Sequence, residues 1–502
     1  MKMKTKYIWL LAVLLSFTAC NNDDDSSSTV DNLPPLTAGE ADFSNYVAVG
    51  ASFSAGFSDG ALFIATQENS FPNIMSKKFE MLGGGSFSQP LMNDNIGGFV
   101  MGGTVVANPR LYFDGSGPVV LPATPTTQIT DHLSGSFNNY GIPGAKSFHL
   151  GIPGYASLNP YFGRMASSPT ATVIGDAVAQ NPTFFTLSEI GGNDVLSYAT
   201  SGGTGVDQTG NLNPATYGVN DITDPNVFAA SFSAAVDALT ANGAKGVVTN
   251  VPYITSLAHF TTVPYNPVPL DAGTAAVVNN AYAAYNAGVA QAFAYLVGIG
   301  AVSQAEADAE IAKRTIMFEA SESNAVVIMD EDLTDLTAIN PQLVSMRQAT
   351  ADDLLVLPAS SFIGTEAVPG NPLTVNGVAI PLADKWVLTP EEQQAIKTAT
   401  DAYNVTIESV ANANGLAMVD FKSILIEAST TGIASGNYIL NTSLVTGGLI
   451  SLDGVHLTSR GYAVMANEMM RAIDATYGSN FEASGNFVDC GDYPTNYSPS
   501  LQ

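Results

Sequence analysis

The sequence predicts an α/β protein built on a doubly wound parallel sheet, with insertions over the carboxyl edge of that sheet. Short apolar runs with β-branched or aromatic residues recur at wide intervals, and each is typical of a buried strand: 46–49, 184–190, 246–251, 325–329 and 416–421. Helical patterns fill the intervals between them. Strands that alternate with helices favour a parallel sheet over a sandwich or a barrel.

The clearest of the predicted helices begins after Thr389, a residue type that caps helix N-termini. Pro390 fits the first turn, Glu392 completes a capping box, and Gly415 ends the pattern just before the last strand. Further helices are predicted over the alanine-rich segment 271–297 and over 303–319. A helix after residue 458 carries a stripe of side chains for burial: Tyr462, Met465, Ala466, Met469 and Ile473.

Two insertions are predicted in the sheet domain, which spans 45–478. The first, 83–135, alternates glycine pairs with apolar residues, so we expect it to be ordered, with a hairpin of 110–113 against 119–121. The second insertion is predicted near 255–385. The tail 479–502 is predicted to be peripheral.

Charge limits the partners of the chain. Of the 502 residues, 45 are acidic and 17 basic, which gives a net charge of −28. Such a polyanion repels nucleic acid and anionic membrane surfaces, so neither is expected as a direct partner. The composition does not indicate an oligomeric state.

The N-terminus has the pattern of a targeting segment, a signal peptide over 1–19. Three lysines precede an apolar run that is too short to span a bilayer. Residues 15–20 resemble a bacterial lipobox, which implies that Cys20 is lipidated; an ordinary signal peptide with an incidental cysteine is the alternative. Residues 20–44 are then a lipid-anchored flexible tether. The acidic cluster after Cys20 resembles the export signals of Bacteroidetes lipoproteins, which implies an outer-membrane lipoprotein facing the cell surface or the periplasm.

Ser52 lies where the first predicted strand ends and a helix begins. At such a corner of a parallel sheet, free backbone N–H groups gather and ligands bind. One interpretation makes Ser52 a helix N-cap. The other makes it a nucleophile, which requires a base and an oxyanion site elsewhere in the chain.

His456 is the candidate base. Asp453 precedes it by three residues across Gly454, a spacing that can bring the carboxylate to the imidazole Nδ1–H and leave Nε2 free to take a proton. Alternatively, this segment is only the loop before the last helix. The four histidines show no metal-ligand spacing, and Cys490 is the only cysteine besides Cys20, so no metal site is predicted.

Four segments, in order, resemble the blocks of the SGNH, or GDSL, hydrolases: 49–56, 139–145, 191–194 and 453–458. The resemblance implies a flavodoxin-like three-layer α/β/α fold and a catalytic triad of Ser52, His456 and Asp453. It also implies an oxyanion hole formed by the N–H groups of Ser52 and Gly144 and by the side chain of Asn193, with Gly141 as the rival to Gly144. No cofactor is implied.

The chain departs from the family at Ala51, where the family has an aspartate beside the nucleophile. The implied reaction is hydrolysis of carboxylic esters, and lipid or fatty-acyl esters are favoured because Phe99, Val100 and Met101 offer a lining for an acyl chain. These three side chains pack the insertion's own small core in the alternative interpretation. Two other functions stay open: a carbohydrate acetyl esterase, and a surface binding protein on a degenerate hydrolase scaffold.

Overall fold

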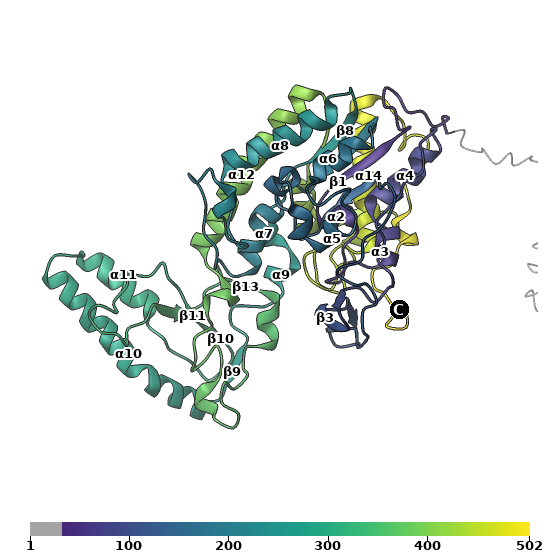
Figure 1. The fold of residues 1–502 in the computed structure, drawn as a ribbon. Helices are drawn as coiled ribbons and strands as arrows, with labels where there is room; N and C mark the ends of the chain where they lie inside the picture. The colour runs from purple at the N-terminus through teal and green to yellow at the C-terminus, as the bar shows by residue number, and fades with distance from the viewer. Residues whose placement is uncertain (1–32) are drawn as a thin grey trace, which may run out of the picture.

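A parallel sheet of five strands lies between two layers of helices in the computed structural model, which describes residues 33–502 (Figure 1). The predicted signal peptide and Cys20 lie outside the described residues. The strands follow one another across the sheet in the order β6 (Asn139–Gly141), β1 (Tyr46–Gly50), β7 (Phe184–Ser188), β8 (Lys245–Thr249) and β15 (Ala417–Val419). All four neighbouring pairs are parallel.

Helices cover both faces of the sheet. One layer contains α6 (Val173–Ala179), α8 (Pro225–Thr240) and α12 (Pro390–Asn414), and the other contains α4 (Phe71–Glu80) and α14 (Ser459–Tyr477). Shorter helices follow the strands or lie at the sheet's edge: α2 (Ser52–Ala55), α3 (Ile64–Glu68), α5 (Pro160–Gly163), α7 (Asn193–Thr200) and α13 (Phe421–Thr430). Within residues 33–502, no helix combines the length and the apolar character needed to cross a membrane.

The core explains why the strands read as continuous apolar runs. Every residue of β1 and of β7 is buried, because helices pack on both faces of the sheet. The predicted helix after Thr389 is confirmed, with its capping box and with Gly415 in the left-handed conformation. All five residues of the predicted stripe on α14 are buried.

One of the five predicted strands is assigned to the wrong sheet. The run 325–329 forms β11 (Val327–Met329), which pairs antiparallel with β12 (Met346–Gln348) outside the central sheet. A short apolar run is buried equally well in either setting, so its composition does not reveal its partner. The fifth place is taken by β6, whose three residues include an asparagine and a glycine.

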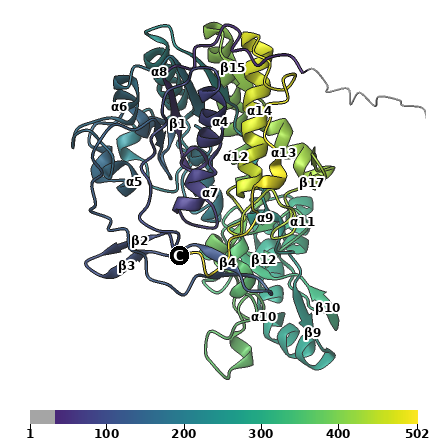
Figure 2. The same ribbon diagram turned by 90° about the vertical axis from the view of Figure 1, so that its right-hand side faces the viewer.

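The second insertion forms a lobe that projects from the sheet domain (Figures 1 and 2). It contains α9 (Ala258–Thr261), α10 (Ala272–Gly298), α11 (Gln304–Arg314) and the antiparallel pairs β9 (Val268–Leu270) with β10 (Ser321–Asn324) and β11 with β12. Helix α11 ends five residues before its predicted end. After its last residue, the side chains of Asn286 and Asn279 in α10 bind the backbone of Ile316 and Phe318. These hydrogen bonds hold the segment after α11 extended.

The first insertion consists of two hairpins, β2 (Phe99–Met101) with β3 (Thr104–Ala107) and β4 (Leu111–Phe113) with β5 (Pro118–Val120). The second hairpin is the predicted one. Both insertions lie at the same end of the molecule in two perpendicular views (Figures 1 and 2). Two further pairs, β13 (Leu354–Leu355) with β14 (Val387–Leu388) and β16 (Ile433–Ser435) with β17 (Tyr438–Leu440), complete the described strands.

Both predicted terminal boundaries are wrong in their described parts. Within the predicted tether 20–44, Phe43 is buried and stacks on Phe79 at a centroid distance of 4.0 Å. The tail is not peripheral either, since Phe481 is fully buried in the main core. Aromatic side chains near a terminus gain more by burial than a flexible segment retains in entropy.

The last residues of the chain bind the side chain of Arg110, a buried arginine of the first insertion. The guanidinium of Arg110 donates to the carbonyl oxygens of Ser498 at 2.7 Å and Leu501 at 3.0 Å, and at 3.4 Å to that of Tyr497. Its Nε donates to the carbonyl of Asn95 at 2.9 Å. The last residues therefore satisfy a charge that is fully buried.

We expect deletion of residues 497–502 to destabilise the protein, because Arg110 then keeps a buried charge without its carbonyl acceptors. Unsatisfied donors of this kind cost about 1–3 kcal/mol, and more when charged, so the free energy of unfolding should fall by roughly 3 kcal/mol. Denaturant unfolding of both proteins measures it. Deletion of Gln502 alone is the control, and equal stability of all three proteins would contradict the role given to Arg110.

Candidate active site

The loop before α14 is folded around the carboxylate of Asp453. Its Oδ1 accepts the backbone N–H groups of Val455 and His456, both at 2.9 Å, and the Ser451 hydroxyl at 3.0 Å. Its Oδ2 accepts the N–H of Gly60 at 2.8 Å and lies 2.9 Å from Nδ1 of His456. Burial alone would raise the pKa of Asp453, but the charge of His456 and these donors hold it well below its usual range.

Asp59 supplies a second carboxylate that is hydrogen-bonded to the same loop. The Asp59 N–H donates to the Ser451 hydroxyl, and the N–H of Leu452 donates to Asp59 Oδ1, each at 3.0 Å. Burial, opposed by the Leu452 N–H and reinforced by the charge of Asp453, raises the pKa of Asp59 to about 7. Sequence reasoning missed this residue, although an aspartate seven positions after the nucleophile candidate was a visible signal.

The lobe fixes the same loop from its other side. The N–H of His259, in α9, donates to the carbonyl of Gly454 at 2.9 Å. Gly454 has φ of +78°, as the predicted tight turn requires, and a Cβ there would lie only 2.8 Å from the His259 nitrogen. Neither a side chain nor a different turn fits this position.

Ser52 is not a helix N-cap. It is the first residue of α2, the cap position belongs to Ala51, and no side chain caps the helix. Within residues 33–502, the Ser52 hydroxyl makes no hydrogen bond, and it lines a cavity at the carboxyl end of β1. The serine at the sheet's corner is therefore open to a ligand.

His456 lies beside α2 without a hydrogen bond to Ser52 among the described residues. Its ring packs against Phe57, at a centroid distance of 4.5 Å, and against Phe53 at 5.8 Å. Nδ1 is held by Asp453, which leaves Nε2 without a protein partner in the described chain. Hydrogen bonds between a catalytic base and its nucleophile are often long in ligand-free proteins.

Gly141 and Gly144, the two candidate glycines of the second motif segment, differ in what their N–H groups bind. The N–H of Gly141 is taken by Oδ1 of Asn139 at 2.9 Å, and a Cβ on Gly141 would lie 2.2 Å from the Ala55 nitrogen, so this glycine serves close packing. Gly144 has φ of +79° with open space around it. Among the described residues, neither its N–H nor that of Ser52 donates a hydrogen bond.

Asn193 and Asp194 connect the start of α7 to the segment that carries Gly144. One N–H of the Asn193 side chain donates to the carbonyl of Ala145 at 2.9 Å, and Asn193 lines the same cavity as Ser52. The buried carboxylate of Asp194 accepts the N–H and the hydroxyl of Ser147, at 2.9 and 2.7 Å. The structure thus brings the second and third motif segments together.

Glu189 is the main residue of the site that sequence reasoning missed. Its Oε1 accepts the N–H groups of Ala51 at 2.6 Å and Ser54 at 2.9 Å, and its Oε2 accepts the Ser54 hydroxyl at 3.2 Å. Its φ of +51° is uncommon for a residue other than glycine. A carboxylate thus lies beside the segment of Ser52 even though Ala51 has none. The signal was an acidic residue directly after a buried strand.

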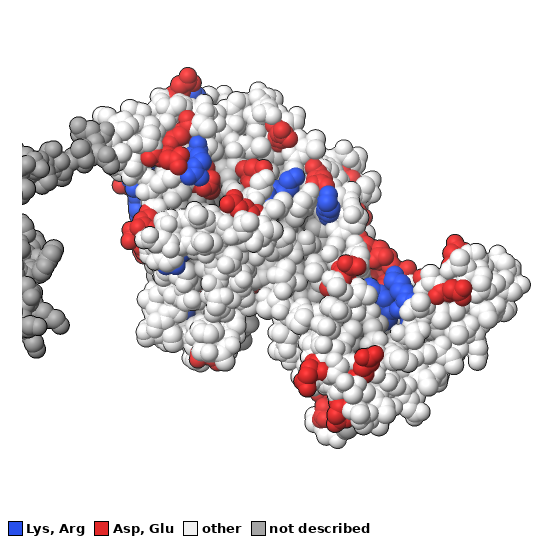
Figure 3. Space-filling model, turned by 180° about the vertical axis from the view of Figure 1, so that it is seen from behind, with Lys and Arg blue, Asp and Glu red and all other residues white. Residues whose placement is uncertain are grey.

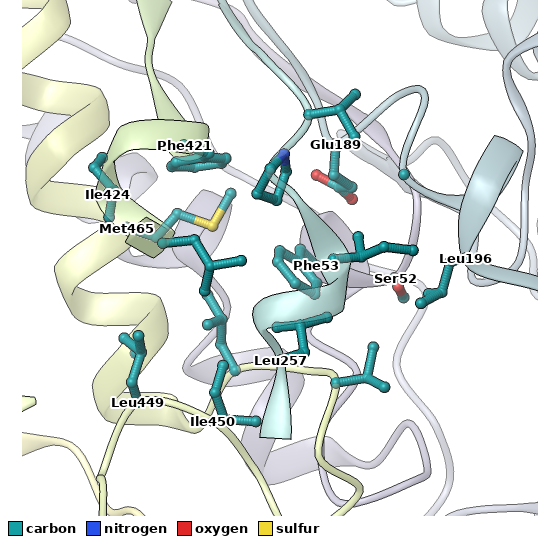
Figure 4. A pocket seen from close by; sticks show the side chains of 18 of the residues that line it. Ser52, Phe53, Glu189, Leu196, Leu257, Phe421, Ile424, Leu449, Ile450 and Met465 are labelled. Atoms are coloured by element: carbon teal, nitrogen blue, oxygen red, sulfur yellow. The ribbon is translucent and has the colours of Figure 1, made fainter. Parts of the chain in front are cut away.

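The environment of Glu189 favours its neutral form. Burial raises the pKa of Glu189 to about 7, although the Ser54 and Ala51 donors oppose that rise. Its carboxylate faces the cavity together with Ser52 (Figure 4).

An apolar cavity with a volume of about 110 Å³ extends from Ser52 between α13, α14 and the segment before α9. Phe53 and Leu196 lie near Ser52, and Ile424 and Met465 lie at the opposite end (Figure 4). The expectation that residues 99–101 line an acyl groove is wrong. Phe99 packs in a small separate core with Ala55, Leu62 and Met92, and Met101 is exposed.

The other three histidines make contacts that are typical of structural residues. Nδ1 of His149 accepts the N–H of Lys146 at 3.0 Å, and burial, together with the Lys146 charge, lowers the pKa of His149 to about 4. His132 contacts the carbonyl of Ala166, and burial lowers the pKa of His259. Among the described residues, no histidine lies in a group with metal-ligand spacing.

We expect Glu189→Gln to change how stability depends on pH. The pKa of Glu189 is higher in the folded chain than its ordinary value of 4.5, so the stability that its protonated form contributes is present below about 4.5 and lost as the pH rises through about 7. Glutamine keeps the acceptor for Ala51 and Ser54 and does not titrate.

Between pH 5 and pH 8, the wild type should therefore lose of the order of 2 kcal/mol more unfolding free energy than Glu189→Gln. Denaturant unfolding at several pH values measures the difference, with the exposed Glu68→Gln as control. Parallel pH profiles for the wild type and Glu189→Gln would show that Glu189 is ionised like a surface carboxylate.

Comparison of the chain with protein-family models, with curated proteins and with solved structures gave no match. The assignment of a reaction therefore depends on the residues and their geometry. Those residues are a serine open to a cavity, a histidine held by a carboxylate, and an asparagine that lines the same cavity as the serine.

Proposed function

We propose that the protein is a serine esterase of the SGNH/GDSL type that hydrolyses carboxylic esters, with fatty-acyl esters as the substrate class. One observation carries the proposal: four motif segments converge at one edge of the sheet, each with its polar group in a usable state. Nδ1 of His456 is bound to Asp453, Ser52 faces a cavity, Gly144 has a free N–H, and Asn193 lines the cavity.

In the proposed mechanism, the Ser52 hydroxyl attacks the ester carbonyl and His456 takes its proton. The tetrahedral oxyanion accepts hydrogen bonds from the N–H groups of Ser52 and Gly144 and from the Asn193 amide, and each such donor typically lowers the barrier by about 3–4 kcal/mol. His456 then protonates the leaving alcohol, and water releases the acid from the acyl-enzyme. Asp453 orients the ring and stabilises the imidazolium.

The apolar cavity supports an acyl chain as the group beside the nucleophile. Its walls are aliphatic and aromatic side chains from α13, α14 and neighbouring loops, which would favour a hydrocarbon chain over the acetyl group of a glycan. A carbohydrate acetyl esterase would not need this volume.

The sheet supports the finer fold assignment. When the strands are numbered in chain order, they lie as 2-1-3-4-5, the order of flavodoxin-like sheets, whose ligands bind where the order reverses. Ser52 follows the first strand of that order, and Asn193 follows the third. We further propose that the enzyme is an outer-membrane lipoprotein anchored through Cys20.

We expect an organophosphonate probe to label Ser52 alone. The Ser54 hydroxyl is bound to Glu189, whereas the Ser52 hydroxyl is open to the cavity. Peptide mass spectrometry locates the label, and hydrolysis of p-nitrophenyl esters of graded chain length should be abolished by Ser52→Ala and to a similar degree by His456→Ala.

Ser54→Ala is the matched control and should keep most of the labelling. Label on Ser54 would overturn the assignment. Hydrolysis of the acetyl ester alone would favour the acetyl esterase, and an inert wild-type protein would favour a surface binding protein.

The length of the cavity predicts a chain-length variant. Ile424 lies at the end of the cavity away from Ser52, so Ile424→Trp should fill that end and lower kcat/KM for an octanoyl ester at least tenfold (Figure 4). The acetyl ester should be hydrolysed as before. Ile426→Trp, at an exposed position of the same helix, is the control. Equal losses on both esters would place the acyl chain elsewhere.

A further inference from the structure

Three carboxylates from separate parts of the chain meet where the lobe joins the sheet domain. Glu331 follows β11, Asp384 lies in the short 3₁₀ turn Asp384–Trp386, and Glu392 lies in the first turn of α12. One oxygen of each lies within 4.8 Å of the others. None of them belongs to the proposed active site.

The three carboxylates lack positive partners. Within residues 33–502, none of them forms an ion pair, and the nearby Lys313 instead contacts Asp330 and Glu391. Acidic and basic side chains are visible together at the surface of this junction (Figure 3). Glu331 is exposed, Asp384 is half-buried and Glu392 is buried, so the cluster extends from the surface inward.

Glu392 has a buried carboxylate oxygen without a hydrogen-bond partner in the described residues. It is only 5% exposed, and its Oε2 accepts the N–H of Thr389 at 2.6 Å. Its Oε1 is buried and has no hydrogen-bond partner, and the same is true of Asp384 Oδ1. Buried carboxylate oxygens without a donor are costly and rare in native proteins.

The backbone around the cluster is shaped for the close approach of these groups. A Cβ on Gly203 would lie 1.6 Å from Glu392 Oε1, and a Cβ on Gly202 would lie 2.4 Å from the carbonyl oxygen of Asp384. Both glycines have positive φ and follow α7, the helix that begins with Asn193. The cluster thus connects the lobe and α12 to the helix that carries the proposed oxyanion donor.

The charges of the cluster oppose one another. Burial, followed by the charge of Glu331, raises the pKa of Asp384 to about 7. Burial, opposed by the Thr389 N–H and reinforced by Glu331 and Asp384, raises the pKa of Glu392 above its usual range. Asp332 also faces this region, and burial, followed by the charges of the carboxylates, raises the pKa of the neighbouring Tyr198. A cation would relieve this repulsion.

We propose that Glu331, Asp384 and Glu392 bind a calcium ion that fastens the lobe to α7 and α12. The donors are all oxygens, which suits a hard divalent cation better than zinc, whose sites contain mainly nitrogen and sulfur ligands. Calcium fits better than magnesium, because it accepts several carboxylates in a flexible geometry, whereas magnesium keeps most of its water. The ion has a structural role that is independent of the esterase reaction.

The test is a calcium titration of the chelator-treated protein, followed by calorimetry and by thermal unfolding. We expect one saturable site at pH 7.5 and a rise in Tm of roughly 3 °C at about 100 times Kd. Magnesium should bind at least tenfold more weakly. Asp384→Asn and Glu392→Gln should lose the saturable binding and the rise in Tm.

Glu392→Gln removes the negative charge and keeps the helix cap, because glutamine also serves at the third position of a capping box. Glu306→Gln changes the same position of the capping box in α11, outside the cluster, and should bind calcium like the wild type. Circular dichroism verifies that each variant is folded, and the wild-type titration decides the case even if a variant is not.

Two outcomes would overturn the proposal. In one, wild-type protein shows no saturable binding up to millimolar calcium, and its Tm rises on acidification alone, so the carboxylates share protons instead. In the other, the two cluster variants bind calcium as tightly as Glu306→Gln, so the ion lies elsewhere.

Discussion

The candidate active site depends on the carboxylate of Asp453. It joins Gly60 to a loop 393 residues further along the chain, and it organises that loop through three more donors besides the ring of His456. Charge-assisted hydrogen bonds of this kind are short and about twice as strong as neutral ones. They are available only to an ionised group, so the loop geometry and the low pKa of Asp453 have one cause. The position of the candidate base is a consequence of both.

The same edge of the sheet also holds carboxyl groups that burial drives toward the neutral form. Asp59 and Glu189 each have a pKa raised to about 7, and each binds backbone N–H groups of the segments beside Ser52 and His456. All three carboxyl groups are removed from bulk water. The pKa of Asp453 is nevertheless low because it accepts more hydrogen bonds and lies next to the ring of His456. A site that contains acidic groups of opposite preference can orient a cationic imidazole and still avoid a large net negative charge.

The sequence predicted the sheet class, four of its five strands and the pairing of Asp453 with His456, because these signals are local. Continuous apolar runs report burial on both faces, and a glycine between an acid and a histidine reports a turn. The rest depends on partners distant in the chain. Nothing local distinguishes the run 325–329, which joins the lobe, from a strand of the central sheet. The role of Glu189 is equally hidden, since its donors lie 135 and 138 residues away.

Both insertions and the C-terminal tail are linked to the loop of Asp453, the lobe directly and the other two through Asp59 and Arg110. The lobe supplies the N–H of His259 to Gly454, and the first insertion supplies the N–H of Leu111 to the carbonyl of Asp59. The C-terminal residues hold Arg110, the neighbour of Leu111. Contacts between residues so far apart in the chain carry an entropic cost of loop closure, which the packing of the whole domain must offset. The insertions and the tail therefore act as supports of the loop that holds Asp453.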